Sequence, residues 1–486
     1  MSQNKSIEKT INWELASVNP NSKNWDWQDL FCFWGVNLQS IIGFSLIASL
    51  YTLYDLNSFV IFFGTIFGSI LVIIFSNLIG KPSQKYGLPF ATFLRSTLGF
   101  GGARFFSFLR GLVGIFMFGI QTYFLSKIIS YLIRILFFTI DKSILDKDIF
   151  LTFLLGLNII DWLSLVICIV LQVYIFSKGM IYNRKIINFS AIAVYLAMIF
   201  FFIIVLLSDV KLTANAFIEV LSFDNFFDYK NIAPIITVAG TIFAYFSIII
   251  ITFGDYSRYL KNEKDLKYGN LTLIINLIIF SIFAIFIVAG SDVFLKQQFN
   301  DINKILTNPT DIIGKLDNLQ ITVIVLIFIV IASASTNLIA NFIPTQYSLI
   351  NFRQNNLNLK TVSYLIGIFG FIIAIFWPTL LSQIGILSFI DTFGSFFGPV
   401  SGVMIINHYS ISQSELNVKD IHSTSPESSF YYSGGWNLKA VYSVVIGFIF
   451  ASSTIWNFDL MFLQSYSWII GAFVSGIVYY LLAKNN

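Results

Sequence analysis

Long apolar runs separated by short polar connections make up almost the whole chain of 486 residues. An α-helix needs about 20 apolar residues to cross a bilayer, and these runs approach or exceed that length. The pattern therefore predicts an all-α membrane protein with twelve transmembrane helices. The predicted helices span residues 29–54, 57–79, 109–133, 150–177, 186–207, 232–254, 270–294, 321–349, 361–377, 380–406, 439–456 and 460–482.

Two of the runs carry polar and small residues at mid-depth, which predicts that their helices are interrupted. In the first run these residues are Gly35, Asn37, Gln39 and Ser40, and in the sixth run they lie within 239–247. Helices one and six are five helices apart, as two inverted five-helix repeats require. Broken helices at matching positions indicate a binding site near the bilayer midplane.

This repeat predicts how the chain is organised. The expected segments are a cytoplasmic N-terminal segment 1–28, a first repeat 29–207, a second repeat 232–406, a cytoplasmic loop 407–438, and two further helices with a short C-terminus in 439–486.

The eighth run contains a dense group of polar side chains between Ala332 and Asn341. Such side chains are costly inside a bilayer unless they face protein, water or a ligand. On a 3.6-residue period Ala332, Ser335 and Thr336 share one face, which could offer a carbonyl and two hydroxyls to a hard cation. Asn337 and Asn341 share another face, which could offer an amide to a polar solute. Close helix packing is the alternative for each residue alone, but the whole cluster favours a transporter core.

Composition supports the membrane assignment, because only 11% of the residues are charged, against about 25% in soluble domains. More than two thirds of the 29 Lys and Arg residues lie in the N-terminal segment and after even-numbered helices. The positive-inside rule then predicts that both termini are cytoplasmic. The net charge of +4 reflects this topology rather than binding of nucleic acid. The cysteines and histidines form no metal-binding or Ser-His-Asp pattern, so we expect no enzyme.

Two more polar residues lie inside predicted helices. Gln121 is an amide at mid-depth in the third helix, where a lone residue more often joins helices than contacts a ligand. Asp391 is the clearest intramembrane acid, and a central Asp costs roughly 2.5–3.5 kcal/mol on insertion scales. Asp391 could serve as a proton site, a gate or a hydrogen-bonded structural acid.

Short motifs are distributed along nearly the whole chain: Asn24-Trp25, Gly87-Leu88-Pro89-Phe90, Arg95-Ser96-Thr97-Leu98-Gly99, Phe118-Gly119-Ile120-Gln121-Thr122, Asp255-Tyr256-Ser257-Arg258-Tyr259, Ser335-Thr336-Asn337 with Asn341, Gly398-Pro399-Val400-Ser401-Gly402 and Tyr432-Ser433-Gly434-Gly435-Trp436-Asn437. In their order and spacing they make the sequence resemble the nucleobase–cation symporter family 1, which includes bacterial hydantoin, uracil, cytosine and allantoin permeases.

The resemblance implies an inverted five-plus-five repeat of the amino-acid–polyamine–cation superfamily type, with two extra C-terminal helices. It also implies a sodium site between helices one and eight. That site would use the carbonyls of Gly35, Leu38 and Ala332 and the hydroxyls of Ser335 and Thr336. No organic cofactor is implied.

The family's substrate site, carried over to this chain, takes Gln39 from helix one, Gln121 from helix three and Asn341 from helix eight. A planar cyclic amide or urea carries both N–H donors and C=O acceptors. Side-chain amides can pair with both.

The family also holds the substrate ring between aromatic faces on helices three and six. The helix-six position matches Phe246, with Tyr245 beside it, whereas the helix-three position, usually Trp, is Met117. A thioether contacts a ring without forming a rigid plate. This departure favours a puckered or smaller solute, such as allantoin, over a planar aromatic one.

The sequence thus predicts a secondary active symporter that imports a nucleobase, hydantoin, allantoin or similar cyclic amide or urea with sodium. One alternative is proton coupling through Asp391 in the same fold. Another is a solute-binding membrane receptor, which no large soluble domain supports. The expected setting is a bacterial inner membrane, with a small-molecule solute and membrane lipid as partners. The oligomeric state is left open, a monomer included.

Overall fold

The computed structural model describes residues 12–53, 57–222, 228–298, 304–316, 318–354, 356–384 and 386–484. Within these ranges, eleven helices are long and apolar enough to cross a membrane, or twelve when a bent pair is taken as one span. This confirms the all-α membrane fold that the apolar runs predict.

The bent pair is α2 (Trp27–Leu38) and α3 (Ile41–Leu53), which meet at 68° and together form helix one. Helices two to twelve follow in chain order: α4 (Ser58–Tyr86), α6 (Arg95–Ile140), α8 (Ile159–Phe176), α9 (Met180–Ser208), α11 (Ile232–Ile251), α13 (Glu263–Gln298), α15 (Leu319–Thr336) continued by η5 (Asn337–Phe342) and α16 (Ile343–Phe352), α17 (Leu359–Phe376), α18 (Ile386–Ile406), α20 (Leu438–Trp456) and α21 (Ser467–Ala483).

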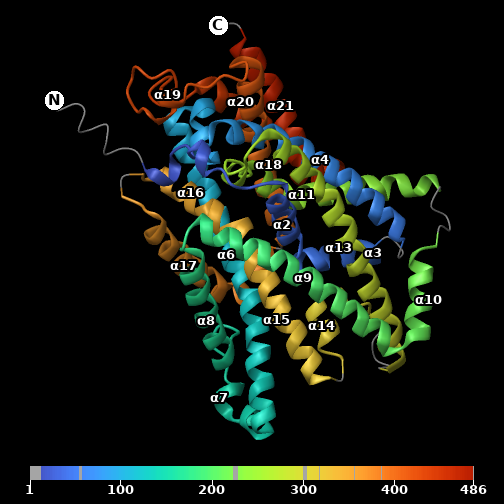
Figure 1. Cartoon of the computed structure of the whole chain (residues 1–486). Helices are drawn as coiled ribbons and strands as arrows, with labels where there is room; N and C mark the ends of the chain where they lie inside the picture. Colours follow the sequence, from blue (N-terminus) through green and yellow to red (C-terminus); the bar gives the residue numbers. More distant parts are fainter. Residues whose placement is uncertain are drawn as a thin grey trace.

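Short helices connect the spans. In Figure 1, α7 is at the lower end, α19 is near the upper end and α10 is at the right-hand edge. The short helices are α5 (Phe90–Phe93), α7 (Asp148–Leu151), α10 (Val210–Val220), α12 (Gly254–Ser257), α14 (Pro309–Ile313) and α19 (Val418–His422).

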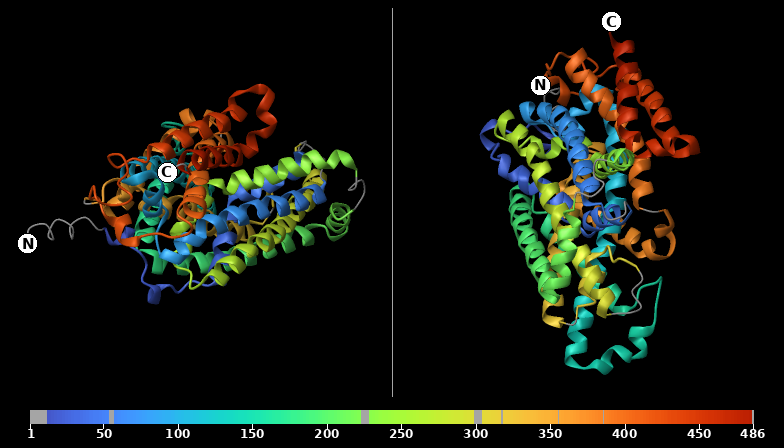
Figure 2. Two further views of the ribbon diagram at one scale, coloured as in Figure 1. Left: turned by 90° about the horizontal axis from the view of Figure 1, so that it is seen from above. Right: turned by 90° about the vertical axis from the view of Figure 1, so that its right-hand side faces the viewer.

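Eight of the helices pack in two groups, and helix one belongs to the first of them. Helices one, two, six and seven contact one another, with α2 on α13 and α11 on α4. In an inverted repeat, helix one corresponds to helix six and helix two to helix seven. The contact of helix one with helix seven therefore corresponds to the contact of helix six with helix two. Helices three, four, eight and nine form the second group around α6. The two C-terminal helices, α20 and α21, pack on α18 along one flank of the molecule (Figure 2).

The predicted interruption of the sixth helix is wrong, because α11 is unbroken through Gly240 and Ser247. A Cβ at Gly240 would lie 2.7 Å from the ring of Tyr466. The Ser247 hydroxyl donates to the Ala244 carbonyl of its own helix at 2.8 Å. These small residues therefore serve close packing, and the helix ends only at Ile251.

Candidate functional site

Helix one breaks at Gln39 and Ser40, as its polar residues predict. The N–H of Ser40 donates to the Leu38 carbonyl at 2.8 Å, and Ser40 Oγ accepts the N–H of Gly43 at 3.0 Å, which caps α3. A Cβ on Gly43 would lie 2.0 Å from the Leu38 carbonyl oxygen, so this turn requires glycine. The break brings the ends of two half-helices into the middle of the bundle.

Helix eight widens into the π-helical turn η5 (Asn337–Phe342) between α15 and α16. Such turns are rare and frequently occur at functional sites. This one carries Asn337 and Asn341, both buried, toward helix three. No residue pattern in the sequence predicts this turn.

Three oxygens predicted to bind sodium lie together at the end of α15. The hydroxyls of Ser335 and Thr336 each lie 3.0 Å from the Ala332 carbonyl oxygen. Thr336 Oγ1 also donates to the carbonyl of Val36 in α2 at 2.6 Å, so this group joins helix eight to helix one.

On the helix-one side, the contact to Thr336 is made by Val36 rather than by the predicted carbonyls. Those of Gly35 and Leu38 accept the N–H groups of Gln39 and Ser40, at 2.9 and 2.8 Å, where the helix breaks. The carbonyl and hydroxyl oxygens of this group are all neutral, and such oxygens are the kind of ligand that binds a hard monovalent cation. The residues therefore fit sodium, and the five-oxygen set remains a prediction.

A cavity lies between the break of helix one and the π-helical turn of helix eight. Helices one, three, six, eight and ten all contribute to its walls. Four of the six predicted solute-binding residues line it: Met117, Gln121, Tyr245 and Asn341. The structure therefore brings these four together in one chamber.

A chain of side-chain amides runs from this cavity into the protein. Asn341 Nδ2 donates to Gln121 Oε1 at 2.8 Å and to Asn337 Oδ1 at 2.9 Å. Asn337 Nδ2 in turn donates to Gln172 Oε1 at 2.8 Å and to Thr122 Oγ1 at 3.0 Å. Helices three, four and eight thereby fix the orientation of the Asn341 amide.

The other two predicted solute-binding residues lie outside the cavity lining. Gln39 Nε2 donates to the carbonyl of Ala191 in α9 at 3.2 Å. Phe246 is fully buried and packs edge-on to Trp34, with ring centroids 5.7 Å apart. The aromatic ring that helix six presents to the cavity is instead that of Tyr245, whose hydroxyl donates to the Asn37 carbonyl at 2.9 Å.

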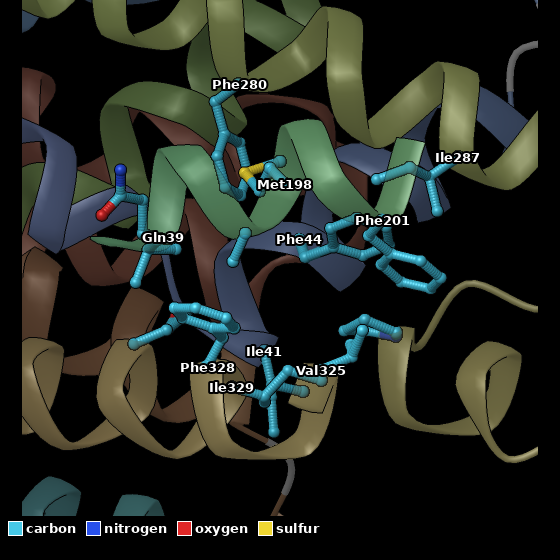
Figure 3. Close-up of a pocket in the computed structure, with 15 residues that line it drawn as sticks. Gln39, Ile41, Phe44, Met198, Phe201, Phe280, Ile287, Val325, Phe328 and Ile329 are labelled. Carbon is cyan, nitrogen blue, oxygen red and sulfur yellow. The ribbon is translucent and has the colours of Figure 1, made fainter. Parts of the chain in front are cut away.

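Gln39 lies at one end of a second cavity, between α3, α9, α13 and α15 (Figure 3). Its other labelled side chains are apolar and include Phe44, Met198 and Phe328. Ser40 lines both cavities. The break of helix one therefore separates a polar chamber from an apolar one.

The beginning of helix ten lies beside the polar cavity. Ile390 lines the cavity, and the ring of its neighbour Phe389 stacks on Phe116 of helix three, with centroids 4.2 Å apart. Phe389 also contacts Phe393 at 4.5 Å. This aromatic contact joins helices three and ten beside Met117 and Ile390, which line the cavity.

Asp391 faces away from the polar cavity, although it follows Ile390 directly. Its Oδ2 accepts a hydrogen bond from Gln464 Nε2 at 2.8 Å. Gln464 belongs to η9 (Phe458–Tyr466), which connects helices eleven and twelve. The Asp391 carboxyl is thus hydrogen-bonded within the protein, which agrees with a structural acid, one of the three roles considered for it.

Sequence reasoning assigned Asn37 and Ser40 to the break in helix one but not to the cavity wall, which both residues line. Their polarity at mid-depth in the first apolar run is the signal that could have placed them there. Which side each one faces depends on the 68° bend, which residue spacing alone does not fix.

Two buried acids lie near the ends of helices, beyond the cavity. Asp29 near the start of α2 accepts hydrogen bonds from both Nε and Nη2 of Arg184 at 2.7 Å, which ties helix one to helix five. Asp255 in α12 is fully buried and accepts the N–H of Phe90 at 2.9 Å. Burial raises the pKa of the Asp255 carboxyl to about 7, against the opposing effect of Arg258.

Comparison with known families gives a match over residues 17–479, to the family described as "Permease for cytosine/purines, uracil, thiamine, allantoin". A purine-uracil permease of Arabidopsis thaliana is 23% identical, over 90% of this chain and 70% of the relative. A putative allantoin permease of Escherichia coli is 24% identical, over 97% of this chain and 94% of the relative.

Solved structures share the fold. The nucleobase-cation-symport-1 family transporter Mhp1, in a closed conformation with bromovinylhydantoin bound, matches with a TM-score of 0.74 and 16% identity, covering 98% of this chain and 95% of Mhp1. A sodium-coupled sialic acid symporter in a substrate-bound outward-open state matches with a TM-score of 0.66 and 15% identity, covering 99% and 93% of the two chains.

Proposed function

The chain belongs to the family of permeases for cytosine/purines, uracil, thiamine and allantoin, and from this we propose that it is a secondary active symporter of a cyclic amide or urea. The observation that carries the proposal is the polar cavity at the break of helix one, where the amides of Gln121 and Asn341 meet. Hydantoins, uracil and allantoin are the solutes considered first, since relatives are named for uracil, allantoin and hydantoin.

The solute would lie with its amide groups against helices three and eight. Tyr245 offers a ring wall from helix six, and Met117 offers a deformable thioether from helix three. Only one of these two residues is aromatic. The cavity therefore accommodates a puckered ring better than a cavity with two rigid aromatic walls would. This supports allantoin or a hydantoin over a large planar purine.

Sodium is proposed as the co-transported ion. Its support is the group of neutral oxygens of Ala332, Ser335 and Thr336 at the junction of helices one and eight. Thr336 also lines the solute cavity. Ion and solute would therefore bind at adjacent positions on the same two helices. Each would then favour binding of the other, because such coupling is reciprocal.

Transport would proceed by alternating access, with both termini on the cytoplasmic side of a cell membrane. Helix ten would close the outer side of the cavity through Ile390 and the stacked rings of Phe389 and Phe116. Helices one, two, six and seven would then rock against the second helix group to open the inner side. No covalent chemistry is involved.

Uptake by the purified protein in liposomes tests this proposal. An inward sodium gradient should drive accumulation of labelled hydantoin, uracil or allantoin, and a proton gradient without sodium should not. Accumulation driven by a proton gradient alone would mean that a titratable group, rather than the sodium site, couples transport. Asp391 would then be the first residue to replace. Absence of uptake of all three solutes under both gradients would contradict the proposed function.

A further inference from the structure

Asn37 is a buried amide in the wall of the polar cavity, and its side-chain oxygen is unpaired within the described part of the chain. Its side chain is fully shielded from solvent, and it lies on α2 just before the break in helix one. Its Oδ1 has no hydrogen-bond partner among the described residues. A buried polar atom without a partner destabilises the folded state, so it calls for an explanation.

The orientation of this amide is fixed by a backbone carbonyl. Asn37 Nδ2 donates to the carbonyl oxygen of Phe33 at 2.9 Å. A carbonyl oxygen can only accept, so the nitrogen must face Phe33 and the oxygen must point the other way. The bond to Phe33 is an ordinary contact one helical turn back, and it accounts for the burial of the nitrogen. The burial of the oxygen without a partner is not accounted for.

The same reasoning fixes the amides on the opposite wall. Asn337 Nδ2 faces the carbonyl oxygen of Phe118 at 3.3 Å, so Asn337 Oδ1 must be the atom that faces Asn341. Both hydrogens of Asn341 Nδ2 are then used, on Asn337 and on Gln121 Oε1. Asn341 Oδ1 remains as an acceptor, and Gln121 Nε2 remains as a donor whose nearest acceptor, the Ser333 carbonyl, is 3.5 Å away.

We infer that Asn37 is a solute-binding residue, and that its Oδ1 accepts a hydrogen bond from an N–H group of the transported solute. Together with Asn341 Oδ1 and Gln121 Nε2, it gives the cavity two amide acceptors and one amide donor. The smallest planar group that complements this set is a ureide, –NH–CO–NH–. The inference rests on the proposed function and narrows its solutes to those with two N–H groups beside one carbonyl.

This assignment separates solutes of similar size. Hydantoin, uracil and allantoin each contain the ureide group. Cytosine carries an unprotonated ring nitrogen beside its carbonyl, and that lone pair would face an amide oxygen. We therefore expect cytosine to bind at least about tenfold more weakly than uracil, as sites that pair a polar group reject solutes lacking it.

The test compares hydantoin with two analogues in the wild-type protein and in Asn37→Ala. Succinimide has CH₂ in place of one ring N–H, and 3-methylhydantoin has a methyl group on the other. Binding is measured by competition with labelled hydantoin in liposomes. Asn270→Ala is the matched control, because Asn270 is equally buried but bonds to Asn77, outside the cavity lining.

In the wild type, at least one analogue should bind about tenfold or more weakly than hydantoin. In Asn37→Ala that penalty should fall to within about twofold, while Asn270→Ala keeps it. If Asn37→Ala does not fold, Asn37→Asp retains the acceptor and should retain the penalty, and Asn37→Ser supplies the truncated variant. An unchanged penalty in the truncated variant would overturn the role of Asn37. Absence of hydantoin uptake by the wild type would instead count against the proposed function.

Discussion

Asn341 Nδ2 lies 2.8 Å from Gln121 Oε1, so a residue of the π-helical turn in helix eight donates directly to a residue of helix three in the wall of the polar cavity. The two side chains are 220 residues apart in the sequence and are both buried. This contact joins the two helices that would hold the solute amide. Its loss should therefore affect binding more than folding.

Replacing Asn341 by Ala should weaken solute binding by about tenfold to a hundredfold, because it removes a solute acceptor and leaves Gln121 Oε1 without its donor. Competition binding with labelled hydantoin measures this. Thr361→Ala is a suitable control, since Thr361 is exposed at the start of α17. Equal effects of the two changes would argue against a solute-binding role for Asn341.

Asn337 should act on binding through Asn341, because its Oδ1 accepts the second hydrogen of Asn341 Nδ2. We expect Asn337→Ala to lower affinity by several-fold. The effects of Asn337→Ala and Asn341→Ala should be strongly non-additive, as residues of one hydrogen-bond network are. A double-mutant cycle on hydantoin affinity measures the coupling. Additive effects would mean that the amide chain does not position Asn341.

Thr336→Val should reduce the sodium dependence of solute binding by about tenfold or more, since it removes a hydroxyl at the junction of helices one and eight while keeping the side-chain shape. Ser333→Ala is the matched control. Ser333 is a buried hydroxyl in the same helix, outside the group around Ala332. Binding titrated against sodium distinguishes them, and an unchanged sodium requirement in Thr336→Val would remove the ion assignment.

Phe116→Ala should loosen the closure of the cavity, because the ring of Phe116 stacks on Phe389 at 4.2 Å. Such a pair contributes about 0.5–1.5 kcal/mol, which corresponds to a roughly twofold to tenfold change in the open population. A cysteine introduced by Ile390→Cys reports opening through its rate of maleimide labelling. The native Cys32 and Cys168 are both buried. Equal labelling rates with and without Phe116 would rule out this closure.

The raised pKa of Asp255 predicts a pH-dependent stability difference between the wild type and Asp255→Asn. Burial raises this pKa to about 7, so the contribution of the carboxyl to stability is full below about pH 4 and is lost as the pH rises to about 7. The Tm of Asp255→Asn minus that of the wild type should therefore increase with pH over this range. A constant difference would show that the carboxyl does not titrate there.

The apolar runs predict the fold well, because crossing a bilayer requires long helices whose composition is visible in the sequence. The ends are less well predicted. α6 starts at Arg95 rather than 109, and a bend at Gly99, where φ is 77°, separates its first residues from the rest. In the sixth helix, glycine and serine indicated a break, yet Gly240 only allows close packing against Tyr466. Small residues fit both situations, and only the neighbouring helix decides between them.

The sequence predicted which residue types form the candidate site better than it predicted the direction in which each side chain points. Asn341 was named from its polarity inside an apolar run, Gln121 was assigned to the solute site by the family resemblance, and both line the cavity. Gln39 and Phe246 were also named, but Gln39, at the 68° bend of helix one, donates to Ala191. Phe246 packs on Trp34, and its neighbour Tyr245 lines the cavity instead. Direction around a helix changes by about 100° per residue. A small error in bend or register therefore exchanges one neighbour for the next.

Ligand-induced stabilisation of the purified protein, measured in sodium and in choline buffer, tests the central claim most directly. Hydantoin, uracil and allantoin should each be tried. A ligand at a hundred times its Kd stabilises the folded state by about 2.7 kcal/mol. We predict that at least one of them raises the Tm in sodium and raises it far less in choline. No increase with any of the three in either buffer would contradict a ureide symporter, and an equal increase in both would contradict coupling to sodium.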